Sequence, residues 1–143
     1  MDKLYETDFY AWTQEQSELL RKQAWDLLDT ANLIEEIESL GRKERQELRN
    51  RLGVLLGHLL KWQYQPEGHS NSWLATIREQ RREIEFLLQE NPSLKPYLAD
   101  AVQKAYESGK DLAVRETNLP YERFPEVCPY TLEQALSANF SQL

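Results

Sequence analysis

With 143 residues, a hydrophobic fraction of 41% and a formal net charge of −7, the chain suits one domain around one core, and its charge argues against nucleic acid as the main partner. No apolar run reaches the ~20 residues of a membrane-spanning helix, and the N-terminus lacks a secretion-signal pattern, which predicts a cytoplasmic protein with no membrane partner. The single cysteine, Cys128, excludes an internal disulfide and fits a reducing compartment.

The charges are distributed unevenly along the chain. Residues 1–40 hold 10 acidic and 3 basic side chains, residues 41–82 hold 4 and 9, and residues 83–143 hold 10 and 5. This pattern favours charge complementarity between neighbouring helices. The alternative is a basic face for phosphates or an acidic partner. That face would use Arg42, Lys43, Arg45, Arg49, Arg78, Arg81 and Arg82.

Helical spacing of apolar residues predicts two helices in the N-terminal part. The first follows a cap at Thr7, and the second covers residues 32–40 behind a cap at Asp29 or Thr30. Gly41 is expected to end or kink the second helix. Its apolar residues form one stripe that we expect to face the core, namely Leu33, Ile37 and Leu40.

A third helix, residues 42–64, ends in the most apolar stretch of the chain, LGVLLGHLLKW at residues 52–62. This stretch is apolar on nearly every side, so other helices must enclose it. Gly53 and Gly57 lie four residues apart, which favours close approach of a neighbouring backbone. His58 is interpreted as the only titratable group inside the run.

Two more helices and a tail complete the prediction. A fourth helix covers residues 73–90, and a fifth covers residues 96–116 with Gly109 in its inner stripe. Three prolines then predict an extended strap, followed by a short last helix behind a capping box of Thr131 and Gln134. The predicted fold is an all-α, up-and-down bundle of about five main helices in a single domain, residues 1–143.

Four polar side chains are expected to point toward the core. They are Glu36, His58, Gln80 and Arg81. A site of Glu36, His58 and Arg81 would offer a base or metal ligand, its orienting carboxylate or co-ligand, and a cation to hold an anion. The repeated Glu-x-x-His spacing of di-metal bundles is absent from the sequence, however. A structural hydrogen-bond network is therefore the favoured interpretation, and any metal is unknown.

Two further clusters have both a structural and a functional interpretation. The tryptophans are expected to be core anchors, although Trp62, Tyr64 and Trp73 bracket a loop and would wall a small pocket there. The binding candidates are Trp62, Trp73 and Gln80. The tryptophan set is Trp12, Trp25, Trp62 and Trp73. Oxygen-bearing residues on the second helix are suited to a divalent cation but are more typical of a solvated acidic face. They are Asn32, Glu35, Glu36 and Glu38.

Five sequence blocks carry a family resemblance. In chain order they are YETDFYAWTQEQSELLR, NLIEEIESLGRKER, HLLKWQYQPE, SWLATIREQRREI and FPEVCPYTLEQAL. In these blocks the chain resembles a bacterial, chiefly cyanobacterial, family known as domain of unknown function 29 (DUF29), over nearly its whole length. The resemblance implies an almost entirely helical single domain and no activity or catalytic residues.

The sequence contains no phosphate-binding glycine loop, nucleophile elbow, zincin motif or paired CxxC. We therefore predict a non-enzymatic helical-bundle protein that acts through protein contact, as a homodimer or with an unknown partner. The alternatives are a small enzyme or metal-binding protein using Glu36, His58 and Arg81, and, more weakly, nucleic-acid binding by a basic helix face. No substrate or cofactor is identified.

Overall fold

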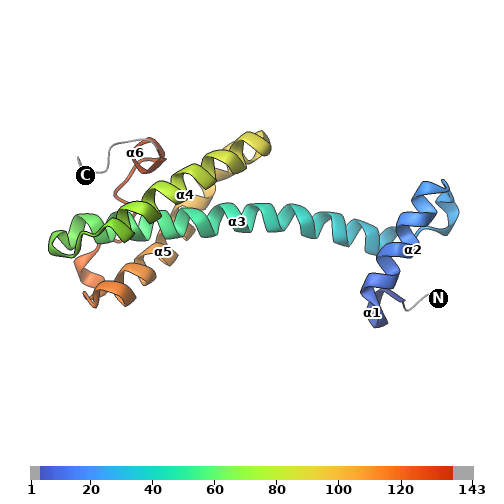
Figure 1. The fold of residues 1–143 in the computed structure, drawn as a ribbon, viewed down its shortest axis with the longest axis horizontal. Helices are drawn as coiled ribbons and strands as arrows, with labels where there is room; N and C mark the ends of the chain where they lie inside the picture. Colours follow the sequence, from blue (N-terminus) through green and yellow to red (C-terminus); the bar gives the residue numbers. More distant parts are fainter. Residues whose placement is uncertain (1–3, 137–143) are drawn as a thin grey trace. The chain divides into compact units, whose positions relative to one another are not determined.

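The computed structural model describes residues 4–136, and within this range the regular elements are helices without any strand (Figure 1). The all-α prediction is confirmed. The long helices are α2 (Phe9–Arg21), α3 (Thr30–Tyr64), α4 (Asn71–Glu90) and α5 (Lys95–Thr117). The short elements are α1 (Leu4–Thr7), α6 (Leu132–Leu136) and the 3₁₀ turns η1 (Trp25–Leu27), η2 (Pro66–Gly68), η3 (Pro92–Leu94) and η4 (Tyr121–Arg123).

The chain divides into two compact units within α3. Unit 1 extends to Lys43 and unit 2 begins at Glu44, so α3 contributes its first half to unit 1 and its second half to unit 2. The single domain over residues 1–143 stays a prediction. No helix in the described part of the chain is both long enough and apolar enough to cross a membrane.

The long helix α3 corrects the prediction of two helices separated at Gly41. It runs without a break from Thr30 to Tyr64. An interior glycine costs a helix about 1 kcal/mol relative to alanine, which is too little to end a helix whose flanking residues are good helix formers. The helix starts where predicted, at Thr30. The Asp29 carbonyl just before it accepts the Leu33 amide at 3.0 Å.

The cap of the first long helix also differs from the prediction. Asp8, not Thr7, caps α2, and its carboxylate accepts the amide of Ala11 at 3.1 Å. Thr7 instead belongs to the separate one-turn helix α1. Both residue types cap helices well, so the choice was decided by the turn that α1 inserts before α2.

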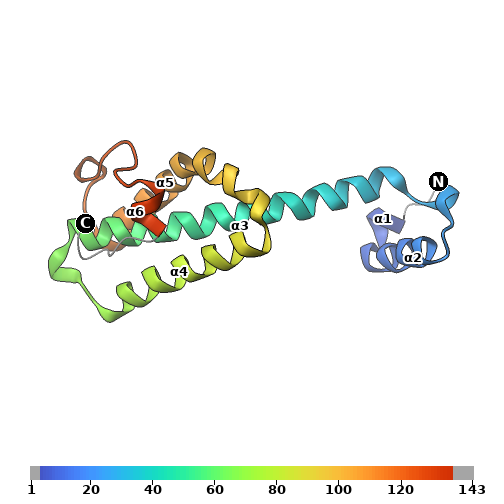
Figure 2. The ribbon, with the colours of Figure 1, turned by 90° about the horizontal axis from the view of Figure 1, so that it is seen from above.

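The second half of α3 forms the centre of unit 2, with α4 and α5 on either side of it (Figures 1 and 2). Six leucines of this half are almost completely buried: Leu48, Leu52, Leu55, Leu56, Leu59 and Leu60. Gly57 and Gly109 allow α3 and α5 to touch, because a Cβ on Gly57 would lie 2.9 Å from the Gly109 carbonyl oxygen. The predicted close approach at these glycines is confirmed.

The C-terminal segment packs onto unit 2 as the predicted strap. Phe124 and Tyr130 are buried in the core, and the Tyr106 hydroxyl donates to the Pro125 carbonyl. The capping box before α6 is confirmed, since Thr131 Oγ1 accepts the Gln134 amide at 3.1 Å and Gln134 Oε1 accepts the Thr131 amide at 3.0 Å. Both ends of the strap are therefore tied to the bundle.

Candidate functional site

His58 lies on the second half of α3 and is buried, as the sequence predicted. Its Nδ1 lies 3.0 Å from the Val54 carbonyl oxygen, one turn earlier on the same helix. Burial lowers the pKa of His58 below its ordinary value of 6.5, so the imidazole is neutral at pH 7 and Nδ1–H donates to Val54. This geometry gives His58 a local structural partner.

Lys61 is the charged residue that the sequence analysis missed. It stands in the same apolar run as His58 and is more deeply buried, so His58 is not the only titratable group there. Its Nζ donates to Glu116 of α5 at 2.6 Å and lies 4.4 Å from the ring centre of Trp73 on α4. The hydrogen bond from Lys61 lowers the pKa of Glu116. One lysine thus links α3 to both flanking helices.

The position of Lys61, three residues after His58, could have revealed this contact from the sequence. A lysine inside an otherwise apolar, all-round buried run must find a carboxylate or an aromatic ring, because burying an unpaired charge is costly.

Arg81 and Gln80 lie next to each other on α4 and have different partners. The Arg81 guanidinium donates to the Ala135 carbonyl at 2.7 Å and to the Gln134 carbonyl at 3.2 Å, at the end of α6. Gln80 accepts a hydrogen bond from Arg51 of α3 at 3.4 Å. Arg81 therefore satisfies the carbonyl groups at the end of α6, which is a structural role for a cation near a helix C-terminus.

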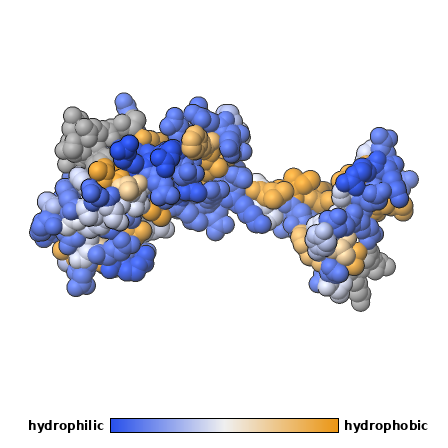
Figure 3. Space-filling model, viewed as in Figure 1, coloured by the Kyte–Doolittle hydropathy of each residue, from blue (hydrophilic) through white to orange (hydrophobic). Residues whose placement is uncertain are grey.

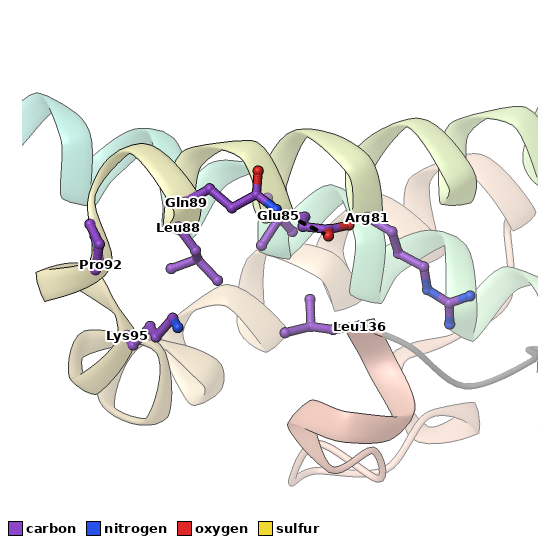
Figure 4. A pocket seen from close by; sticks show the side chains of 8 residues that line it. Arg81, Glu85, Leu88, Gln89, Pro92, Lys95 and Leu136 are labelled. Carbon is purple, nitrogen blue, oxygen red and sulfur yellow. Dashed lines mark hydrogen bonds between the residues drawn. The ribbon is translucent and has the colours of Figure 1, made fainter.

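Arg81 also lines a pocket of about 630 Å³ between α4, η3, the start of α5 and α6. Figure 4 shows apolar Leu88 and Leu136 beside the charged Glu85 and Lys95 around it. The lining residues are Arg81, Ile84, Glu85, Leu88, Gln89, Pro92, Lys95 and Leu136. Its volume falls within the range of small-molecule sites, about 300 to 1,000 Å³.

Trp62 and Trp73 both pack against His69 of the loop between α3 and α4. The His69 ring stacks on Trp62 with centres 3.6 Å apart, and Trp73 meets His69 edge-on at 6.4 Å. Both tryptophans are half-buried, whereas Trp12 is buried. Trp25 is 59% exposed, so the prediction that all four tryptophans are core anchors was wrong for Trp25.

Glu36 lies in unit 1, on the first half of α3, and the Tyr5 hydroxyl of α1 donates to its carboxylate. This hydrogen bond raises the pKa of Tyr5 to about 12. His58 and Arg81 lie in unit 2, so a joint site of the three residues stays a prediction. Among the residues that the structure describes, no group of three or more His, Cys, Asp or Glu side chains is arranged to hold a metal ion.

A polar cluster at Asp29 ties α2 to the start of α3. The Asp29 carboxylate accepts from Trp12 Nε1 at 3.0 Å and from Asn32 Nδ2 at 2.8 Å, while Gln16 accepts the Asp29 amide at 2.9 Å. These hydrogen bonds lower the pKa of Asp29. Asn32, one of the proposed cation ligands, therefore serves this cluster.

The first half of α3 exposes the stripe that we expected to face a core. Ile37 is 66% exposed and Leu40 is 62% exposed, so the prediction of an inward stripe was wrong for both, while Leu33 is half-buried. Ile34 is also exposed, and Figure 3 shows apolar residues at the surface along this half of the helix. We call Ile34, Ile37 and Leu40 the open stripe.

Gly41 follows Leu40 on α3 and is also exposed. A Cβ placed on Gly41 would have no neighbour within 4 Å, whereas a Cβ on Gly53, Gly57 or Gly109 would press against another backbone. The usual packing reason for an interior helix glycine is therefore missing at this position in the described part of the chain.

The family model described as "Domain of unknown function DUF29" matches residues 4–141. No curated protein and no solved structure is significantly similar to the chain. The geometry thus has to indicate the function, and its most unusual feature is the open stripe with the other exposed apolar residues of unit 1.

Proposed function

The chain belongs to the DUF29 family, whose description names no function, and we propose that it acts through protein contact at the apolar surface of unit 1. The observation that supports this proposal is where the exposed apolar residues lie. In the described part of the chain, eight of the eleven exposed large hydrophobic side chains belong to unit 1. These eight are Phe9, Tyr10, Leu20, Trp25, Leu27, Ile34, Ile37 and Leu40.

Unit 1 has a very small core for the number of large apolar side chains that it exposes. Among its described residues only one hydrophobic side chain, Trp12, is buried, and the polar Gln16 is the other buried group. Units of this size rarely bury enough apolar surface to be stable alone, and a concentration of exposed apolar residues marks an interaction site. A partner that covers this surface would supply the missing burial.

The charges of unit 1 favour a protein over an anionic partner. Glu35, Glu36 and Glu38 are interspersed with the open stripe. Nucleic acids and anionic lipid surfaces attract basic segments and repel acidic ones. We therefore propose a protein partner rather than nucleic acid or a membrane surface.

The test is co-purification from a lysate of the source organism, with the full chain as bait. We expect the wild-type chain to retain a second copy of itself or another protein. The double variant Ile37→Glu/Leu40→Glu is expected to lose that protein. Val127→Glu is the matched control, because Val127 is an equally exposed apolar residue, at 69%, in unit 2. Circular dichroism of each variant checks that the helices are retained.

A wild-type chain that is strictly monomeric and retains no protein would overturn the proposal. Equal retention by the wild-type chain and the double variant would also overturn it, because contact would then not use the open stripe.

We also propose a cytoplasmic location. Cys128 is half-buried, and burial raises the pKa of its thiol, which keeps it in the unreactive thiol form. Labelling of freshly lysed cells with a thiol reagent under denaturing conditions is expected to find Cys128 reduced. A blocked thiol would contradict a reducing compartment.

A further inference from the structure

We propose that the pocket between α4, η3, the start of α5 and α6 binds a small organic monoanion, a carboxylate carried on an apolar body. The site lies in unit 2 and is independent of the protein contact proposed for unit 1. Its volume of about 630 Å³ is that of a small-molecule site, and half of the lining side chains in the described part of the chain are apolar. These four are Ile84, Leu88, Pro92 and Leu136.

The pocket opens onto the hydrophobic core of unit 2. Ile84 is almost completely buried, and Leu88 and Leu136 are half-buried against the core. Figure 4 shows Leu88 and Leu136 extending from α4 and α6 into the space between the two helices. Covering apolar surface of this kind releases water from it and favours binding. The apolar body of the ligand is therefore placed against these two leucines.

The walls of the pocket are fixed before a ligand binds. Arg81 of α4 holds α6 in place through its two hydrogen bonds to carbonyl groups near the end of α6. At the other end of the pocket, the Asn91 side chain donates to the Leu87 carbonyl at 3.1 Å, and Pro92 begins the turn that leads into α5. A preformed pocket binds with a smaller loss of conformational entropy than one that must first be ordered.

The charges around the pocket favour an anion. Arg81 and Glu85 stand one turn apart on α4, so their opposite charges largely offset each other. The Glu85 carboxylate also accepts a hydrogen bond from the Gln89 amide at 3.3 Å. Within the described residues the Lys95 ammonium group has no ion-pair partner. Lys95 is the first residue of α5, where the helix dipole adds to its positive charge.

The single available lysine restricts the class of anion. A phosphate monoester carries about two negative charges at pH 7 and is usually held by several basic groups. Glu85 in the same lining opposes the binding of a polyanion. A monocarboxylate matches Lys95 alone, and its apolar body matches the leucines beside it.

Methyl-detected NMR of the full chain, titrated with octanoate, tests the site. We expect the methyl signals of Ile84, Leu88 and Leu136 to shift together and to saturate, with a dissociation constant of about 1 mM or lower for a ligand of this size. The signals of Ile37 and Leu40, on the exposed surface of unit 1, are the internal comparison and are expected to shift less. The absence of a saturable shift at the pocket would overturn the inference.

A neutral ligand and a lysine variant test the charge. Octanamide has the shape of octanoate without its charge, and we expect the wild-type chain to bind octanoate at least about threefold more tightly. Lys95→Gln is expected to remove this preference and to leave the affinity for octanamide unchanged. Lys104→Gln, which removes an exposed lysine of α5 outside the pocket, is the matched control and is expected to keep the preference.

Two results would rule out the anion site. One is equal binding of the two ligands by the wild-type chain, and the other is a preference for octanoate that survives Lys95→Gln.

The variant Leu136→Gln tests the apolar wall. It is expected to weaken octanoate and octanamide alike, by at least about threefold, because both ligands lose the same apolar contact. Circular dichroism checks that the helices are retained. Unchanged affinity for both ligands would contradict the placement of the apolar body and with it the inference. All of these outcomes leave the protein contact at unit 1 untouched, since the two surfaces share no residue.

Discussion

The two halves of α3 both carry an apolar stripe, but the two stripes have opposite environments. From Leu48 to Lys61 the helix contains six buried leucines and is enclosed by α4 and α5, whereas Ile34, Ile37 and Leu40 of the first half are more than half exposed. Both halves are equally helical. An apolar stripe therefore favours a helix and requires a covering surface, but a stripe does not determine whether the same chain provides that surface.

Substitution of one core residue and one stripe residue tests this contrast most strongly. We expect Leu55→Ala to lower the free energy of unfolding by about 2 to 5 kcal/mol, because its buried side chain leaves a cavity. Ile37→Ala, measured at low protein concentration, is expected to change it by about 0.5 kcal/mol or less. Urea denaturation measures both. Equal losses would mean that Ile37 is packed within the monomer.

Glycine substitutions make the same comparison at the backbone. Gly57→Ala places a Cβ 2.9 Å from the Gly109 carbonyl oxygen and is expected to cost about 1 to 3 kcal/mol. Gly41→Ala meets no neighbour and is expected to stabilise the helix by up to about 1 kcal/mol. Thermal unfolding of both variants, in the Ile37→Glu/Leu40→Glu background, measures the difference. A destabilising Gly41→Ala in that background would contradict an open helix face.

Buried Lys61 is a further difference between the enclosed second half of α3 and its exposed first half. Glu116→Ala leaves the Lys61 ammonium buried without its carboxylate, which is expected to cost about 1 to 3 kcal/mol. Lys61→Met removes the charge and its desolvation together, so we expect a change within about 1 kcal/mol. Urea midpoints of the two variants measure this order. If Lys61→Met were the more damaging change, the pair would be a net source of stability.

Substitution of His58 is expected to have the smallest effect on stability, and this effect depends on pH. Because the pKa of His58 is lowered in the folded chain, the unfolded chain binds its proton more readily. The stability contributed by neutral His58 is therefore complete above pH 6.5 and falls as the pH drops below it. Lys61 lowers this pKa further, whereas Glu116 and the Val54 carbonyl oppose the shift.

Urea midpoints at about pH 7.5 and about pH 5.5 test the effect of His58. We expect His58→Gln to reduce the difference between the two values. An unaltered pH dependence in His58→Gln would show that His58 ionises as easily in the folded chain as in the unfolded one.

Local signals predicted the elements of unit 2 well. The end of α3, the bounds of α5 and the capping box before α6 follow from apolar periodicity, proline and capping residues, which act within a few positions. Gly41 misled the prediction because its cost is small beside the cooperativity of a long helix. The candidate site was harder to predict, since the hydrogen-bond partners of Arg81 and Lys61 lie more than fifty residues away in the chain.

The sequence by itself determined that the chain is helical, that residues 48–62 need enclosure and that Gly53, Gly57 and Gly109 mark a close contact. Periodicity and backbone preference are properties of neighbouring residues, so one chain is enough to read them. Only the tertiary structure decided which apolar stripe is covered and which is open. Burial depends on surfaces brought together from distant parts of the chain, and for Ile34, Ile37 and Leu40 the described chain brings none.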